Sequence, residues 1–288
     1  MPKYSVIIPT YNNADRIRRS VKSVLNQKFE DWELIIVDDG STDETSTVVS
    51  AFLKDRRIKY IKIKNSGVSV ARHTGVENAI GEYLTFVDGD DEVKENWLTD
   101  FNELISGNTG YLSCGYHLNG EDKYPKFNKE ISEFKYSSLA GTFALTKIVY
   151  DSIGGYDQNL KQSENYEMTA RAVEYCFNND MRVVYTDNCN FIYHHSKTHE
   201  QTLERDRLRA QATLYLHEKY SNGGILHFRK DNYLKSAAVN FIRIGEIAKG
   251  RSILLKIIKN KPSLSSFLDL LVIEIPFLRK KIWIRKST

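Results

Sequence analysis

The sequence predicts an α/β protein with a mostly parallel sheet, helices on both faces of that sheet, and a helical C-terminal extension. Short apolar runs alternate with amphipathic helical patterns between residues 4 and 104, as βαβ units require. The apolar runs are nearly continuous, which is typical of strands that are covered on both faces. Beyond residue 200 only helical spacing recurs clearly.

Four units repeat the order strand, loop, helix. Their strands are expected at Tyr4–Pro9, Glu33–Asp38, Ile58–Ile63 and Tyr83–Val87, and the fourth helix is expected within Val93–Leu104. Later elements are expected to be strands at Tyr111–Tyr116 and Met181–Tyr185 and helices at Leu203–Tyr220 and Tyr233–Ala248. Because the carboxyl ends of parallel strands meet at one edge of a sheet, the first four loops should gather there.

Three carboxylates follow the fourth strand directly. Asp88, Asp90 and Asp91 end the apolar run, and Gly89 lies between the first two. Carboxylates this close repel one another unless a cation lies between them. Oxygen ligands suit Mg²⁺ or Mn²⁺, and both ions pair readily with phosphates. The alternative is a solvated acidic turn that caps the following helix, and these residues alone leave both interpretations open.

The other loops at this edge carry side chains suited to a nucleotide. They offer a ring and hydrogen-bonding groups for a base, an acid for ribose or a metal, and a glycine and an arginine for phosphate. In chain order these residues are Thr10, Tyr11, Asn12, Asp39, Gly67 and Arg72. The GxGxxG and GxxxxGK[ST] motifs of dinucleotide folds and P-loop enzymes are absent. Each residue also has an ordinary structural explanation, so the hypothesis depends on their occurring together.

Composition narrows the class of protein further. The net charge is only +4 over 288 residues, which argues against a nucleic-acid binder that relies on phosphate neutralisation. The three cysteines are widely spaced and form no CxxC pair, so neither a disulfide framework nor a zinc site is indicated, and a cytoplasmic location is expected. The N-terminal residues lack the apolar core of a signal peptide, and no apolar run reaches the length of a membrane span.

Positive charge is concentrated toward the C-terminus. Residues 249–288 contain ten Lys or Arg and two acids, and they combine this charge with Leu, Ile, Phe and Trp. Basic amphipathic helices of this kind commonly lie on anionic membrane surfaces, so peripheral membrane contact through residues 250–288 is expected. The alternative is that these helices pack against the protein itself or against a second copy in a homodimer.

Five motifs occur in a recognisable order up to about Tyr185: SVIIPTYNN, LIIVDDGSTDET, GVSVARHTG, GEYLTFVDGDD and GGYDQNLKQSENYEM. Together they resemble glycosyltransferase family 2, the inverting enzymes of GT-A fold that use nucleotide sugars. The resemblance implies a GT-A catalytic domain over residues 1–200, with residues 201–288 as a helical extension. His73 stands where the family more often has asparagine, which leaves the helix assignment intact.

The same resemblance implies a role for each motif. Four residues would hold the nucleobase, most often uracil: Pro9, Thr10, Tyr11 and Asp39. Arg72 would lie against the base or the diphosphate, and Asp88 would contact the ribose. Asp90 would bind Mn²⁺ or Mg²⁺, with Asp91 nearby. The implied reaction is transfer of a sugar from a nucleotide donor such as a UDP-sugar to a glycan, lipid-linked or protein acceptor, as in surface polysaccharide synthesis.

The sequence departs from the family at the catalytic base. After the GG[YF]D turn an acidic pair, usually Glu-Asp, opens a helix, and its aspartate commonly acts as general base. Here the pair is Glu164-Asn165, and an amide cannot accept a proton at physiological pH. Glu164 is therefore the candidate base. Alternatives are an acceptor acidic enough to need little help, such as a thiol, and a Glu164 that only stabilises the helix N-terminus.

Two histidines, His194 and His195, come after the last predicted strand. A ring nitrogen of His195 would complete the coordination of an ion at Asp90 or bind the diphosphate; the alternative is a histidine without a ligand. The sequence thus predicts a metal-dependent inverting glycosyltransferase. The rival functions are a nucleotidyltransferase and a protein that binds sugar nucleotides with little or no catalysis.

Overall fold

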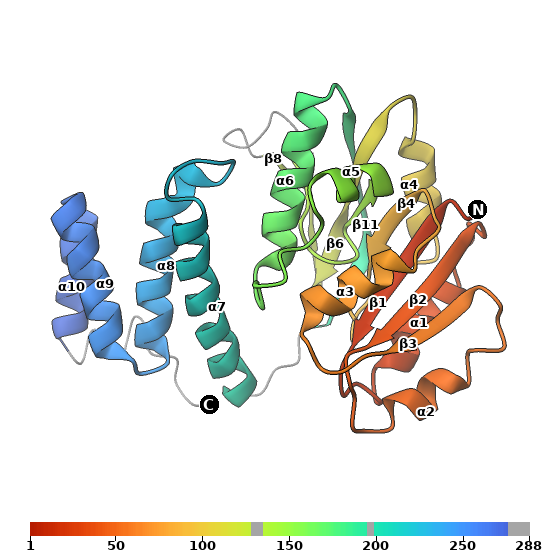
Figure 1. The fold of residues 1–288 in the computed structure, drawn as a ribbon, viewed down its shortest axis with the longest axis horizontal. Helices are drawn as coiled ribbons and strands as arrows, with labels where there is room; N and C mark the ends of the chain where they lie inside the picture. The colour runs from red at the N-terminus through yellow and green to blue at the C-terminus, as the bar shows by residue number, and fades with distance from the viewer. Residues whose placement is uncertain (128–134, 195–198, 276–288) are drawn as a thin grey trace. The chain divides into compact units, whose positions relative to one another are not determined.

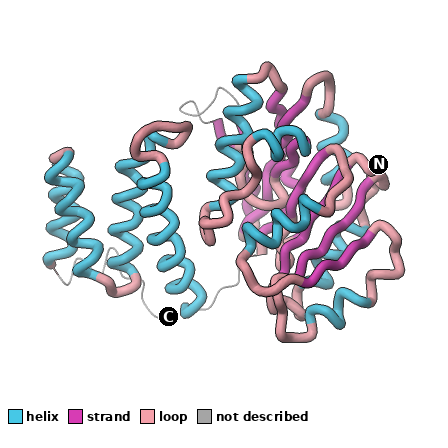
Figure 2. Tube along the Cα trace, in the orientation of Figure 1, coloured by secondary structure: helices cyan, strands magenta, loops and turns pink. Residues whose placement is uncertain are grey.

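The computed structural model describes residues 1–127, 135–194 and 199–275. The chain divides into two compact units, residues 1–160 with 164–195 and residues 161–163 with 196–288. Figure 1 shows the sheet and its covering helices in the first unit. In Figure 2 the described part of the second unit consists of helices and loops.

The first unit is built on a nine-stranded sheet with the order β3-β2-β1-β4-β10-β6-β11-β5, and β7 pairs with β6. Its strands are β1 (Tyr4–Thr10), β2 (Trp32–Asp38), β3 (Ile58–Lys62), β4 (Tyr83–Phe86), β5 (Glu92–Val93), β6 (Thr109–Leu118), β7 (Glu121–Lys123), β10 (Phe143–Thr146) and β11 (Arg182–Tyr193). Strands β8 (Lys126–Phe127) and β9 (Lys135–Tyr136) form a separate pair. The first four strands of the order run parallel, whereas β10 is antiparallel to both of its neighbours.

Helices cover both faces of the sheet. They are α1 (Ile17–Leu25), α2 (Thr45–Ser50), α3 (Val68–Glu77), α4 (Trp97–Leu104), α5 (Lys147–Ser152) and α6 (Glu164–Asn178). Strand β1 shows why both faces are apolar: Val6 and Ile8 pack in the core with α1 and α4, while Ile7 packs in the core with α3 and α6. Figure 1 shows these two helix layers on opposite sides of the strands. The predicted α/β fold class is confirmed.

The second unit contains α7 (His199–Lys219), the short 3₁₀ helix His227–Arg229, α8 (Lys230–Arg243), α9 (Ile247–Asn260) and α10 (Leu264–Glu274). Ala210 of α7 packs with Phe241 of α8, and a second cluster joins Ile242, Leu254 and Ile273 of the last three helices. Within the described ranges, none of the helices combines the length and the apolar character that crossing a bilayer demands.

Several predicted elements have different bounds in the structure, and two of these differences change the order of the elements. The helix predicted over Tyr233–Ala248 is interrupted at Gly245, whose φ of 87° lies in the left-handed region that favours glycine, so α8 and α9 are separate helices. The fourth helix begins only at Trp97, because Glu92 and Val93 pair with β11 as a short strand.

Candidate active site

The ends of β1, β2 and β4 bring the predicted nucleotide-binding residues to one edge of the sheet. Thr10 pairs with Asp38 in the parallel register, and the backbone N–H of Asp39 donates to the Thr10 carbonyl at 2.8 Å. Pro9 lies one residue earlier on the same strand. The turn after β4 reaches the same place: a Cβ on Gly89 would lie 2.7 Å from Asn13 Nδ2 and 3.1 Å from Thr10 Oγ1.

Thr10 Oγ1 and Asn13 Oδ1 are among the buried polar atoms at this edge that lack a hydrogen-bond partner in the described part of the chain. Their residues are only 5% and 6% exposed. Buried polar groups are nearly always paired in folded proteins, because an unpaired one costs free energy. The edge therefore has vacant hydrogen-bonding capacity suited to a polar ligand such as a nucleotide.

Asp39 and Gly67 contact each other directly. The Asp39 carboxylate accepts hydrogen bonds from the backbone N–H groups of Ser66 at 2.7 Å and Gly67 at 2.8 Å. Gly67 has a φ of 96° and precedes α3, so its left-handed conformation turns the loop into the helix. An ionised carboxylate has about four acceptor sites, so Asp39 retains capacity for a further donor.

Tyr11 and Asn12 differ in their surroundings. The Tyr11 ring is 50% exposed and is free to stack on a planar ligand. The Asn12 side-chain oxygen accepts from the backbone N–H of Thr42 at 2.8 Å, and the Asn12 N–H donates to Ser41 Oγ at 2.9 Å. Asn12 thus connects the loop after β1 to the loop after β2.

Arg72 lies at the centre of a buried charge cluster. Its guanidinium donates to Asp88 Oδ1 and to Glu164 Oε1, both at 2.7 Å, and lies over the Tyr156 ring. Burial alone would lower the pKa of Arg72, but Asp88, Tyr156 and Glu164 together raise it above its usual value. The cluster joins the end of β4 to the start of α6.

Asn165 is held next to this cluster. The Tyr156 hydroxyl donates to Asn165 Oδ1 at 2.7 Å, and burial raises the pKa of Tyr156 well above its ordinary value, so the phenol keeps its proton.

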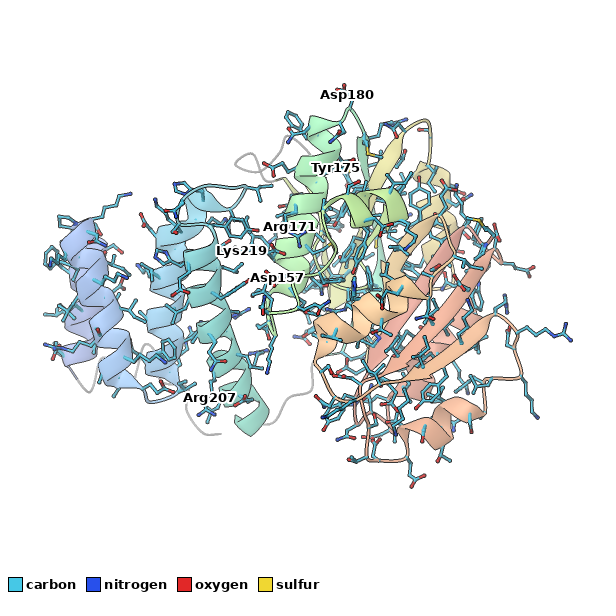
Figure 3. The ribbon with its side chains drawn as sticks, viewed as in Figure 1. Asp157, Arg171, Tyr175, Asp180, Arg207 and Lys219 are labelled. Carbon is cyan, nitrogen blue, oxygen red and sulfur yellow. The ribbon has the colours of Figure 1, made fainter. Side chains whose placement is uncertain are left out.

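Arg171, labelled in Figure 3, donates to the carbonyls of Ile153 and Gly155 and to the Glu167 carboxylate. These bonds fix the glycine turn against the first part of α6, where Glu164 and Asn165 lie.

Two arginines at the start of α1 lie beside the acidic turn. Arg19 donates to the Asp90 carbonyl at 2.5 Å, and the Arg16 guanidinium lies 3.5 Å from the Asp90 carboxylate. Burial, together with the neighbouring Asp88 and Asp90 carboxylates, raises the pKa of Asp91 to about 8. A divalent cation would offset this repulsion, so the chemistry of the turn fits a metal.

No group of three or more His, Cys, Asp or Glu side chains gathers into a metal-binding cluster among the residues that the structure describes. The backbone N–H of His194 donates to Asp91 Oδ1 at 2.9 Å, and the His194 ring lies 2.5 Å from Glu92 Oε1. The end of β11 therefore reaches the acidic turn. His195 lies outside the described residues, so its contact with an ion stays a prediction.

Several residues at this edge were not predicted from the sequence. Asn13 ends the polar run after β1, so its position in the sequence marks it as a candidate. Tyr156 is the aromatic residue of the GG[YF]D turn. Arg16 and Arg19 gave no signal, because charged residues on an amphipathic helix are usually solvated. Their role follows from how α1 packs beside the turn.

The fold is an α/β domain whose polar loops gather at one edge of the sheet, and comparison with known proteins identifies the family. Residues 5–162 match the model of Glycosyl transferase family 2. The chain therefore belongs to this family, and the predicted enzyme class, glycosyltransferase, is confirmed.

Among curated relatives, the GalNAc(5)-diNAcBac-PP-undecaprenol beta-1,3-glucosyltransferase of Campylobacter jejuni is 40% identical over 158 residues, 50% of each chain. The chain spans half or less of the length of the first curated relatives that it matches.

Two solved structures share the fold. TarS 1–349 of S. aureus with UDP-GlcNAc has a TM-score of 0.61 at 20% identity and covers 96% of this chain and 82% of its own. The mannosyltransferase PcManGT of Pyrobaculum calidifontis, with GDP-Man and Mn²⁺, has a TM-score of 0.63 at 17% identity and covers 97% and 83%. The predicted GT-A fold with a helical C-terminal region is thus confirmed.

Proposed function

We propose that this chain is a metal-dependent inverting glycosyltransferase that takes a sugar from a nucleotide donor, with a UDP-sugar as the first choice. The observation that supports this best is the convergence of Thr10, Asp39 and the Asp88–Asp91 turn at one edge, where Thr10 Oγ1 is buried without a hydrogen-bond partner among the residues that the structure describes. TarS, a structure that shares the fold, contains UDP-GlcNAc, and PcManGT contains GDP-Man.

The donor would lie across the three loops. We assign the base to Pro9, Thr10 and the exposed ring of Tyr11, with Asp39 as acceptor for a base N–H and Asn12 fixing the loops around it. Gly67 leaves room for the backbone to approach the diphosphate. Asp88 would hold the ribose, positioned by Arg72, whose ion pairs with Asp88 and Glu164 direct it toward carboxylates rather than toward phosphate.

Asp90 is the residue proposed to hold Mn²⁺ or Mg²⁺, with His195 as a second candidate and Asp91 and Gly89 in the same turn. Such ions commonly use one or two carboxylates and take further oxygens from water and substrate phosphates, so a larger protein cluster is unnecessary. The bound ion would supply stabilisation of the charge that develops on the leaving diphosphate.

Glu164 is the proposed general base. Arg72 engages its Oε1, which leaves Oε2 to accept the proton of the acceptor nucleophile. Asn165 occupies the place of the usual aspartate and can orient the acceptor only by hydrogen bonding. An acceptor as acidic as a thiol would need less help from this base.

Glu164→Gln is expected to lower sugar transfer by about 10²- to 10⁴-fold, the usual contribution of general-base catalysis, while donor affinity stays nearly constant. Adding Asn165→Asp to this variant should restore part of the rate, because it supplies a carboxylate one residue away. Transfer rates, calorimetric donor affinity and Tm would be compared with Glu77→Gln, a matched change at a glutamate that is 62% exposed. Equal rates in Glu164→Gln and the unaltered chain would exclude Glu164 as base.

The acceptor is proposed to be a glycan, a lipid-linked saccharide or a protein, in polysaccharide or glycoconjugate synthesis. The Campylobacter relative is named for an undecaprenol-linked acceptor, which supports the lipid-linked choice. With such an acceptor we propose a cytoplasmic location at the inner membrane surface, a catalytic domain of residues 1–200 and an extension of residues 201–288. A homodimer through the extension is the alternative use of that segment.

Incubation with Mn²⁺ and a panel of sugar nucleotides tests the function. Release of nucleoside diphosphate from one donor, increased by an acceptor mixture, is the expected result. Release of pyrophosphate would instead identify a nucleotidyltransferase. Donor binding without turnover, across acceptors of all three classes, would identify a sugar-nucleotide-binding protein and contradict the proposal.

A further inference from the structure

Helix α10 has an outward face made entirely of large apolar side chains. Leu264, Phe267, Leu268 and Leu271 are 77%, 51%, 53% and 53% exposed, and Ile275, just after the helix, is 39% exposed. The first four lie at the spacing i, i+3, i+4, i+7, which places them on one side of a helix.

The opposite side of α10 already forms the packing of the second unit. Ile273 is 1% exposed and packs with Leu254 of α9 and Ile242 of α8. Figure 1 shows α9 and α10 lying side by side in this unit. The exposed face is therefore not the face that α10 uses for folding. A contiguous apolar surface rarely stays exposed on a soluble protein unless it binds something.

The described residues of α9, α10 and their connection include more basic than acidic side chains. Residues 249–275 contain five Lys or Arg and two acids, Asp269 and Glu274. Lys235 pairs with Asp269 at 2.6 Å, and Arg251 pairs with Glu274. Both acids are thus already neutralised by partners in the described part of the chain.

Helix α9 also carries exposed lysines beside an exposed apolar side chain. Lys256 and Lys259 are exposed, neither has a carboxylate partner within the described residues, and Leu255 beside them is 41% exposed. A second copy of this surface would bring two positive segments together, and like charges repel. An anionic lipid surface supplies both the negative charge and the apolar layer that this surface lacks.

We infer that α10 and α9 bind the surface of an anionic phospholipid bilayer, with Leu264, Phe267, Leu268 and Leu271 buried among the lipid acyl chains and the lysines of α9 at the headgroups. The helix lies in the interface: its 11 residues are too few to span a bilayer. Helices α9 and α10 would thus be the part of the chain that contacts the membrane proposed above. Their binding depends only on the second unit and not on the proposed chemistry.

Sedimentation of the full chain with vesicles tests the inference. Vesicles of phosphatidylcholine with about a third phosphatidylglycerol should bind the chain at least about tenfold more tightly than pure phosphatidylcholine, and rising salt should weaken that binding. Leu268→Glu with Leu271→Glu should abolish it. The matched control is Leu53→Glu, at a leucine of the first unit that is 41% exposed; it should bind normally. Lys256→Glu with Lys259→Glu should reduce binding only to the anionic vesicles.

Equal binding to both vesicle types, or unchanged binding of the leucine double variant, would overturn the inference. Light scattering after size exclusion is the second readout. A concentration-dependent dimer that the leucine double variant dissociates would show that a second copy covers the face instead. Donor hydrolysis by the leucine variant should match that of the unaltered chain, so loss of vesicle binding is distinguishable from failure of the proposed transfer.

Discussion

Replacing Arg72 by alanine is expected to lower the free energy of unfolding of the first unit by about 3 kcal/mol. The change leaves two carboxylates, on Asp88 and Glu164, without the guanidinium that now lies 2.7 Å from each. The loss should lie at the lower end of the range for broken buried ion pairs, because Asp88 is 37% exposed and water can solvate it, whereas Glu164 is only 11% exposed.

Urea unfolding followed by tryptophan fluorescence measures this effect, since Trp32 and Trp97 are buried in the first unit. Arg207→Ala is the matched control: Arg207, labelled in Figure 3, pairs with Glu204 on α7 and is 52% exposed, so its loss should cost less than about 1 kcal/mol. Equal stability of both variants would mean that the buried cluster is not ion-paired in solution.

Asp90→Ala is expected to abolish metal-dependent nucleotide binding and to raise the barrier to transfer by several kcal/mol, the usual contribution of a catalytic metal. The reason is that Asp90 provides the proposed protein ligand in a turn where burial, together with the Asp88 and Asp90 carboxylates, raises the pKa of Asp91 to about 8. Calorimetry of nucleoside diphosphate with and without Mn²⁺ measures the binding.

A matched aspartate far from the turn provides the control for this variant. Asp151 on α5 is 59% exposed, and Asp151→Ala should bind nucleotide with unchanged Mn²⁺ dependence. If Asp90→Ala retains the Mn²⁺-dependent affinity of the unaltered chain, Asp90 is not a metal ligand. A comparison of Tm between the two variants separates loss of the site from loss of the fold.

The parallel part of the sheet was predictable because each strand is a continuous apolar run. Strands such as β1 are covered on both faces, so nearly all of their residues are apolar and the strand can be recognised as an apolar run. The gathering of Thr10, Asp39 and the acidic turn followed from the same prediction, since strand polarity fixes which loops meet.

The bounds of the later strands and helices were harder to predict from the sequence. Strand β11 runs from Arg182 to Tyr193, well beyond the predicted Met181–Tyr185, and its register against β6 shifts. Its middle part alternates between exposed and partly buried residues, so no apolar run indicated its length. Gly245 resembled any small residue within a helical pattern, because a positive φ has no signature apart from the residue type itself.

The contacts of Arg72 could not be predicted from the sequence for a different reason. Asp88 lies 16 positions away and Glu164 lies 92 positions away, and they meet only because α3, β4 and α6 pack together. An arginine near phosphate-binding loops and an arginine neutralising carboxylates have the same local pattern. Distinguishing them requires the distances.

Gly89 is closely packed between Asp88 and Asp90. A Cβ at this position would lie 2.7 Å from Asn13 Nδ2, closer than van der Waals contact allows. Substitution at residue 89 would therefore require the Asn13 side chain to shift. A change at the neutral glycine would thus disturb the loop after β1 without altering either aspartate.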